Sequence, residues 1–74
     1  MTQDYYLQLW IDAGKQPISS PEDYLHCLEA AIDRKDVQLV HDLWDACMVS
    51  WEEEDSLADE HELVDAMATK LVNG

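Results

Sequence analysis

Apolar residues recur at three- and four-residue steps along most of this chain, which is the spacing of amphipathic helices. The pattern predicts four helices, at about residues 3–13, 21–33, 36–51 and 57–72. The predicted connections between them are short. We therefore expect an all-α fold, either a small three- or four-helix bundle or an orthogonal helix array, in a single domain over residues 1–74.

The first predicted helix has one apolar stripe, formed by Tyr6, Leu9, Trp10 and Ala13. Thr2 is suited to cap its start, and Gly14 can take the left-handed conformation that ends many helices. The apolar residues from Tyr5 to Ile11 also alternate with a period of two, which fits a short strand. Both interpretations of this segment remain open.

The second predicted helix has the clearest start in the chain. Ser20 stands at the N-cap and Pro21 at the first helical position, where a missing N–H costs nothing. Glu22 and Asp23 then lie near the positive end of the helix dipole. Residues 34–36 are expected to form a tight turn before the next helix.

The third predicted helix begins at Asp36 as N-cap and has the longest apolar stripe, formed by Val37, Val40, Leu43, Trp44, Cys47, Met48 and Trp51. Four consecutive acids at residues 52–55 interrupt this stripe for more than a turn. Ser56 then resembles a new N-cap with Asp59 three residues later. We predict a fourth helix there, and the alternative is one bent helix over residues 36–72.

The charge balance is the most unusual property of the composition. The chain has 17 acidic residues against four lysines and arginines, a formal net charge of −13. This exceeds the magnitude of about 2–8 that suits a small soluble domain. Direct binding to nucleic acid or to anionic lipid is disfavoured by repulsion. The expected partner is a basic protein surface, for example that of a nucleic-acid-binding protein.

The sequence also indicates where the protein is found. The segment from Met1 to Asp4 has no basic region followed by an apolar run, and no apolar stretch approaches the roughly 18 residues of a membrane span. We expect a cytoplasmic protein with no membrane partner. Cys27 and Cys47 are then expected to remain reduced.

The residues that could carry chemistry do not form a known motif. His26, His41 and His61 lack the paired spacing of a zinc site, and the zincin-like segment from His61 ends in Asp65 rather than histidine. The sequence shows no glycine-rich phosphate loop and no EF-hand loop. We therefore predict no enzymatic activity, no cofactor and no metal site.

The acidic residues are concentrated in the C-terminal half, where residues 37–74 carry ten acids and only one lysine. Carboxylates along helices at about 5–6 Å spacing can resemble the phosphate rows of a duplex, although a solvated helical face is the commoner explanation. Trp51 directly precedes four acids and could anchor an interface. The candidate partner-binding residues are Asp42, Asp45, Trp51, Glu52, Glu53, Glu54, Asp55, Asp59, Glu60, Glu62 and Asp65.

These features predict a small acidic binding protein that docks on a basic surface of a partner protein and inhibits or modulates it. Phage- or plasmid-encoded inhibitors of host defence, including anti-CRISPR and anti-restriction proteins, resemble this chain in size, charge and lack of catalytic motifs. The resemblance covers composition and no motif, and it implies a nucleic-acid mimic. The alternative function is a structural or regulatory helical module, such as an immunity-type protein, an adaptor or a homodimer.

Overall fold

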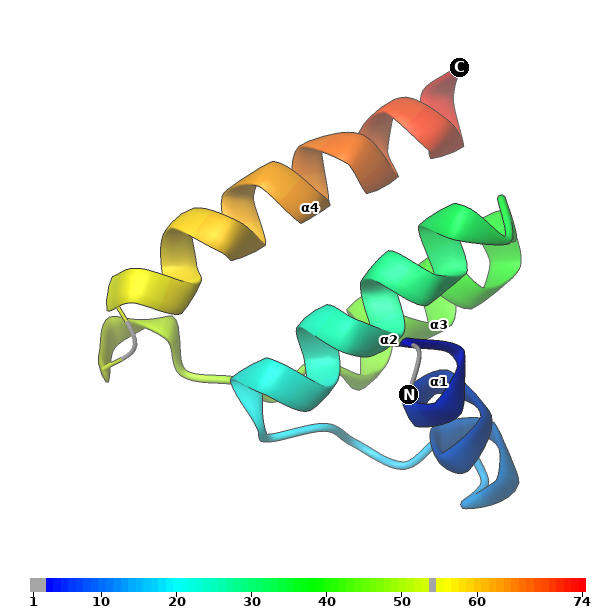
Figure 1. Ribbon diagram of the computed structural model, residues 1–74, viewed down its shortest axis with the longest axis horizontal. Coiled ribbons are helices and arrows are strands. Elements are labelled where there is room, and N and C mark those ends of the chain that lie inside the picture. Colours follow the sequence, from blue (N-terminus) through cyan, green and yellow to red (C-terminus); the bar gives the residue numbers. More distant parts are fainter. Residues whose placement is uncertain (1–2, 54) are drawn as a thin grey trace.

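The computed structural model describes residues 3–53 and 55–74. These residues form four α-helices and one 3-10 turn, with no strand among them, so the all-α prediction is confirmed (Figure 1). The predicted N-cap Thr2 lies outside the described residues. The elements are α1 (Gln3–Asp12), α2 (Pro21–Asp33), α3 (Val37–Ala46), η1 (Trp51–Glu53) and α4 (Asp55–Asn73).

Helix α2 is the centre of the fold. It packs against α1, α3 and α4, and Figure 1 shows it lying between α4 on one side and α1 on the other. This position explains its sequence, because apolar residues occupy several faces of α2 rather than one stripe. Its buried residues are Tyr24, Leu25, Cys27, Leu28, Ala30 and Ala31.

The other helices each contribute a narrower apolar face to this core. Val40 and Leu43 of α3 are fully buried, as are Leu7 of α1 and Ala68 of α4. The apolar stripe predicted for α1 is partly wrong. Leu7, which it did not include, is fully buried, whereas Leu9 is 50% exposed and Ala13 is also exposed. The helix itself is confirmed over the strand alternative.

The ends of α1 and α2 are closed by backbone hydrogen bonds. After α1, the N–H of Lys15 donates to the carbonyl of Trp10 at 3.0 Å, and Gly14 has the predicted positive φ of 90°. After α2, the N–H of Asp36 donates to the carbonyl of Ala31 at 3.1 Å, and Lys35 has a φ of 55°. Both are Schellman-type ends, the second without a glycine.

The start of α3 agrees with the sequence and its end does not. Asp36 caps the helix by accepting a hydrogen bond from the N–H of Leu39 at 3.2 Å. The prediction that this helix reaches residue 51 is wrong, because it ends at Ala46. The carbonyl of Ala46 accepts from the N–H of Ile18, and the N–H of Met48 donates to the carbonyl of Ile18, both at 2.8 Å. These bonds pull residues 47–50, here called the strap, into an extended path.

Helix α4 begins earlier than predicted. It includes Asp55 and Ser56, so Ser56 lies inside the helix and is not its cap. An acid in the first turn is favourable near the positive end of the dipole. The strap and η1 separate α3 from α4, which excludes the single bent helix. None of the described helices combines the length and apolar character that a bilayer span requires.

We expect Gly14→Ala to lower the free energy of unfolding by about 1–2 kcal/mol, because an L-residue is strained at this positive φ. A Cβ at Gly14 would meet no atom within 4 Å, so the cost comes from the backbone alone. Urea denaturation measures the change. Lys35→Gly is the matched control and should not destabilise the protein, since it relieves the same strain. A fully stable alanine variant would contradict this account of the α1 end.

Candidate functional site

A cavity of about 500 Å³ opens where four parts of the chain meet. Tyr24 comes from α2, Trp44 from α3 and Trp51 from η1, while His61 and Asp65 lie one turn apart on α4. We call this cavity the aromatic pocket. Its lining residues are Tyr24, Trp44, Cys47, Val49, Trp51, His61, Asp65 and Thr69.

Three of its rings contact one another. Trp51 and His61 are stacked, with centroids 4.1 Å apart and planes 22° apart. The ring of Tyr24 lies 6.1 Å from that of Trp51 at 60° and 5.7 Å from that of His61 at 43°. These distances are those of favourable aromatic pairs. The contacts join η1 to α2 and α4, so the half-buried Trp51 has a fixed place in the pocket wall.

The polar groups of the aromatic pocket are partly desolvated. Burial raises the pKa of Tyr24, and the neighbouring Cys47 and Asp65 raise it further because negative charge there disfavours a phenolate. The indole N–H of Trp44 is buried and has no hydrogen-bond partner among the described residues. Asp65 contributes a carboxylate to a lining whose aromatic members are Tyr24, Trp44, Trp51 and His61.

An exposed row of carboxylates runs beside this pocket. Asp55, Asp59 and Glu62 follow one another at four- and three-residue steps along α4, which places them on one stripe. We call these three residues the acidic stripe. Glu62 is three residues before Asp65, so the stripe borders the α4 wall of the pocket. None of these four acids forms an ion pair with a lysine or arginine in the part of the chain that the structure describes.

The remaining predicted site residues are dispersed. Asp42 and Asp45 line a different hollow with Lys15, and the carboxylate of Asp42 is 2.6 Å from the Lys15 ammonium. That hydrogen bond lowers the pKa of Asp42. Glu60 is exposed on α4, away from the acidic stripe, and Glu52 is exposed on η1. Glu54 and the side chain of Glu53 lie outside the described residues.

The sequence did not identify all of the residues that form the pocket. Trp51 and Asp65 were predicted separately, and the structure brings them to the same cavity. Trp44 was assigned to a helix stripe, Tyr24 was not among the candidate site residues, and His61 was considered only as a zinc ligand. The sequence feature that could have indicated the pocket is the one-turn spacing of His61 and Asp65, which places an aromatic ring and an acid on the same helix face.

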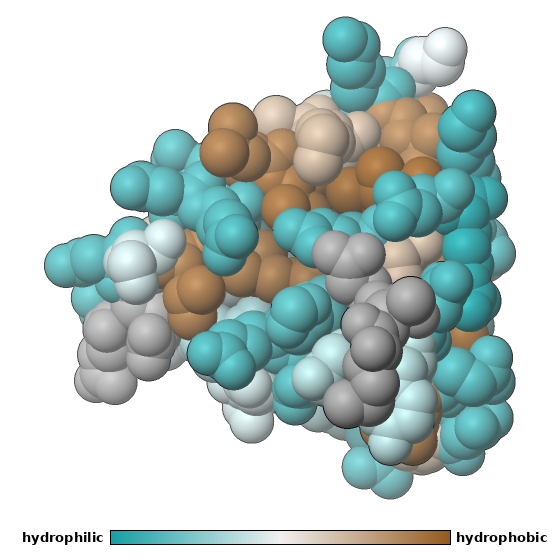
Figure 2. Space-filling model, viewed as in Figure 1, coloured by the Kyte–Doolittle hydropathy of each residue, from teal (hydrophilic) through white to brown (hydrophobic). Residues whose placement is uncertain are grey.

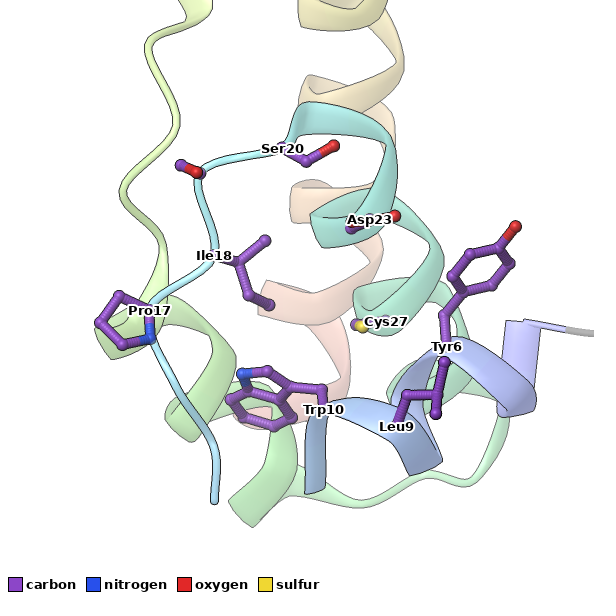
Figure 3. Close-up of a pocket in the computed structure, with 9 residues that line it drawn as sticks. Tyr6, Leu9, Trp10, Pro17, Ile18, Ser20, Asp23 and Cys27 are labelled. Atoms are coloured by element: carbon purple, nitrogen blue, oxygen red, sulfur yellow. The ribbon is translucent and has the colours of Figure 1, made fainter. Parts of the chain in front are cut away.

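A second cavity, of about 330 Å³, lies between α1, the loop of residues 13–20 and the start of α2. Figure 3 shows Ile18 reaching from the loop toward Trp10 and Cys27. The indole N–H of Trp10 donates to the carbonyl of Gln16 at 2.7 Å, which fixes the loop. This cavity has a mainly apolar floor and suits a small apolar group. Its lining is Tyr6, Leu9, Trp10, Pro17, Ile18, Ser19, Ser20, Asp23 and Cys27.

Within residues 3–53 and 55–74, no three histidine, cysteine or carboxylate side chains lie close enough together to hold a metal ion. Comparison of the chain with protein families, curated proteins and solved structures gives no match. The argument about function therefore rests on the two cavities, the charges and the exposed surfaces.

We expect Cys47 to be alkylated well before Cys27 in the folded protein. Burial, with the nearby charge of Asp23, raises the pKa of Cys27 to about 11, so roughly one thiol in a thousand is ionised at pH 8. Iodoacetamide at pH 8 should label Cys27 at least about tenfold more slowly than the half-buried Cys47, as measured by peptide mass spectrometry. Raising the pH toward 11 should accelerate the Cys27 reaction. In denaturant the two rates should converge, and convergence without denaturant would contradict this burial.

Proposed function

We propose that this protein is a small acidic binding protein that docks on a basic surface of a partner protein and inhibits or modulates it. The observation that carries the proposal is the acidic stripe on α4, whose carboxylates are exposed and uncompensated beside a preformed aromatic pocket. Charge at the rim and aromatic groups at the centre are the usual composition of a protein interface.

The charge supplies attraction over a distance. With a formal net charge of −13, the chain attracts a basic surface strongly at low ionic strength. Two of its four basic residues already face acids of the same chain, as Lys15 pairs with Asp42 and Arg34 with Asp4. Those pairs lie on other elements, so they leave the field of the acidic stripe unchanged.

A finer version of this proposal is mimicry of nucleic acid. Successive carboxylates of the acidic stripe lie about one helical turn apart, close to 5–6 Å. A row of this kind could occupy a groove that normally binds phosphates. Phage or mobile-element inhibitors of host defence, of anti-CRISPR or anti-restriction type, are one class of protein in which such mimicry would be useful. The cytoplasm is the compartment in which we propose that it acts.

A second candidate function is a helical interaction module that pairs with a copy of itself or with an adaptor. Leu63 and Met67 lie one turn apart on the solvent side of α4 and are 68% and 50% exposed. Figure 2 shows hydrophobic surface extending along α4 toward α2. An exposed apolar pair of this size could be covered by another chain. Such an interface would be nearly indifferent to salt.

The first experiment captures partners from a lysate of the cells in which the protein is made, at low salt, and elutes them with a salt gradient. We expect a basic protein that is released at moderate ionic strength. Its affinity should fall about five- to tenfold when Asp59→Asn and Glu62→Gln are combined, because two charges facing the partner are lost. The affinities are measured by surface plasmon resonance at two salt concentrations.

The matched control combines Asp12→Asn with Asp33→Asn, two exposed acids on α1 and α2. This variant has the same net charge as the α4 variant and should bind within about twofold of the wild type, since its changes lie away from the acidic stripe. Equal weakening by both variants would show a general charge effect. A partner that resists high salt, or recovery of the protein alone, would favour the helical module.

A further inference from the structure

We infer that the aromatic pocket receives one arginine side chain of the basic partner, which is held between the aromatic rings and the carboxylate of Asp65. This inference deepens the proposed function and rests on it for the source of the arginine. The pocket itself is a property of this chain, so its chemistry can be tested without the partner.

The rings make the pocket attractive to a cation. The indole of Trp51 is the aromatic group that binds cations best, and its stack on His61 holds one face of the indole in a fixed orientation. Tyr24 is 1% exposed and packs at an angle against both rings, so it holds Trp51 and His61 in place. Fixed rings of this kind bind a desolvated cation without first having to be ordered.

Asp65 supplies the negative charge inside the pocket. It lines the cavity one turn after His61, and its charge contributes to the raised pKa of Tyr24. The one lysine of α4, Lys70, is five residues further on and therefore about 140° around the helix, so it faces away from the pocket. The pocket therefore combines a carboxylate and aromatic rings, and its lining contains neither lysine nor arginine.

The chemical groups of the pocket favour arginine over lysine. A guanidinium is planar, stacks on aromatic faces and can donate two parallel hydrogen bonds to one carboxylate. A lysine ammonium is compact and strongly hydrated, and it would lose more on entering a partly desolvated cavity. A cavity of about 500 Å³ is also within the usual size range of sites for small groups.

The second cavity and the exposed apolar pair on α4 offer no comparable combination of groups. The second cavity also places a carboxylate, that of Asp23, near an indole, but Trp10 is only 7% exposed and its N–H is already bonded to the Gln16 carbonyl. The exposed pair Leu63 and Met67 is accounted for by the alternative function, and no feature of the structure identifies what would cover it. The aromatic pocket differs because two half-buried rings, those of Trp51 and His61, are stacked in its wall beside the carboxylate of Asp65.

The test titrates the full-length protein with a blocked Gly-Arg-Gly tripeptide and follows the indole N–H signals by NMR. We expect the signals of Trp51 and Trp44 to shift in a saturable way. The signal of Trp10 should stay constant, because that indole lies in the other cavity and is bonded to the Gln16 carbonyl. The same peptide with citrulline, which has the shape of arginine and no charge, should cause no shift. A lysine peptide should bind more weakly.

Two isosteric variants distinguish the effect of the pocket carboxylate on peptide binding from the effect of the overall negative charge. Asp65→Asn should weaken arginine-peptide binding by about fivefold or more, because it removes the carboxylate partner. Asp33→Asn changes the net charge equally at an exposed position at the end of α2 and should leave binding within about twofold. Circular dichroism and thermal melts establish that both variants fold. In the folded protein, equal effects of the two variants would overturn the inference.

The remaining outcomes are also decisive. Equal shifts with citrulline, or equal shifts at Trp10, would overturn the arginine site, and equal binding of lysine would overturn the preference for a guanidinium. If the lysate experiment yields no basic partner while the arginine peptide still binds, the proposed function fails and the pocket stands. If a basic partner binds Asp65→Asn and Asp33→Asn equally well, the proposed function stands and the pocket inference fails.

Discussion

Two backbone hydrogen bonds at Ile18 join the loop of residues 13–20 to the end of α3, and the rest of the structure depends on this contact. The N–H of Ile18 donates to the carbonyl of Ala46, and its carbonyl accepts from the N–H of Met48, both at 2.8 Å. The two bonds stop α3 and turn residues 47–50 into the strap. If α3 continued to residue 51, Trp51 would belong to that helix. The strap instead places Trp51 in η1, where its ring stacks on His61 of α4.

A small acidic chain must hold this arrangement against its own charge. The ion pairs Lys15–Asp42 and Arg34–Asp4 join elements that are distant in sequence, but they are solvent-exposed, and such pairs contribute little to stability. The buried apolar residues around α2 therefore supply most of the stability. Because α2 touches the three other α-helices, loss of its packing would affect the whole fold.

The sequence predicted the parts of the fold that depend on local residues. Asp36 as a cap, Pro21 at the start of α2 and the left-handed Gly14 were all recognisable from their neighbours. The end of α3 was not, because the group that ends it is Ile18, far away along the chain. The candidate site shows the same limit. Trp51 was recognised as unusual, but its contacts with Tyr24 and His61 form only once the hydrogen bonds of Ile18 have ended α3.

The acidic stripe and the aromatic pocket would contribute to binding in different ways. Exposed carboxylates act over roughly 8–10 Å at physiological salt, so they mainly accelerate and orient the encounter. The half-buried rings of Trp51 and His61 would act only in contact and would mainly slow dissociation. Asp65 belongs to both groups, since it borders the acidic stripe and lines the pocket. In the proposed complex, one residue would thus link the two effects and direct the basic surface attracted by the stripe to the rings of Trp51 and His61.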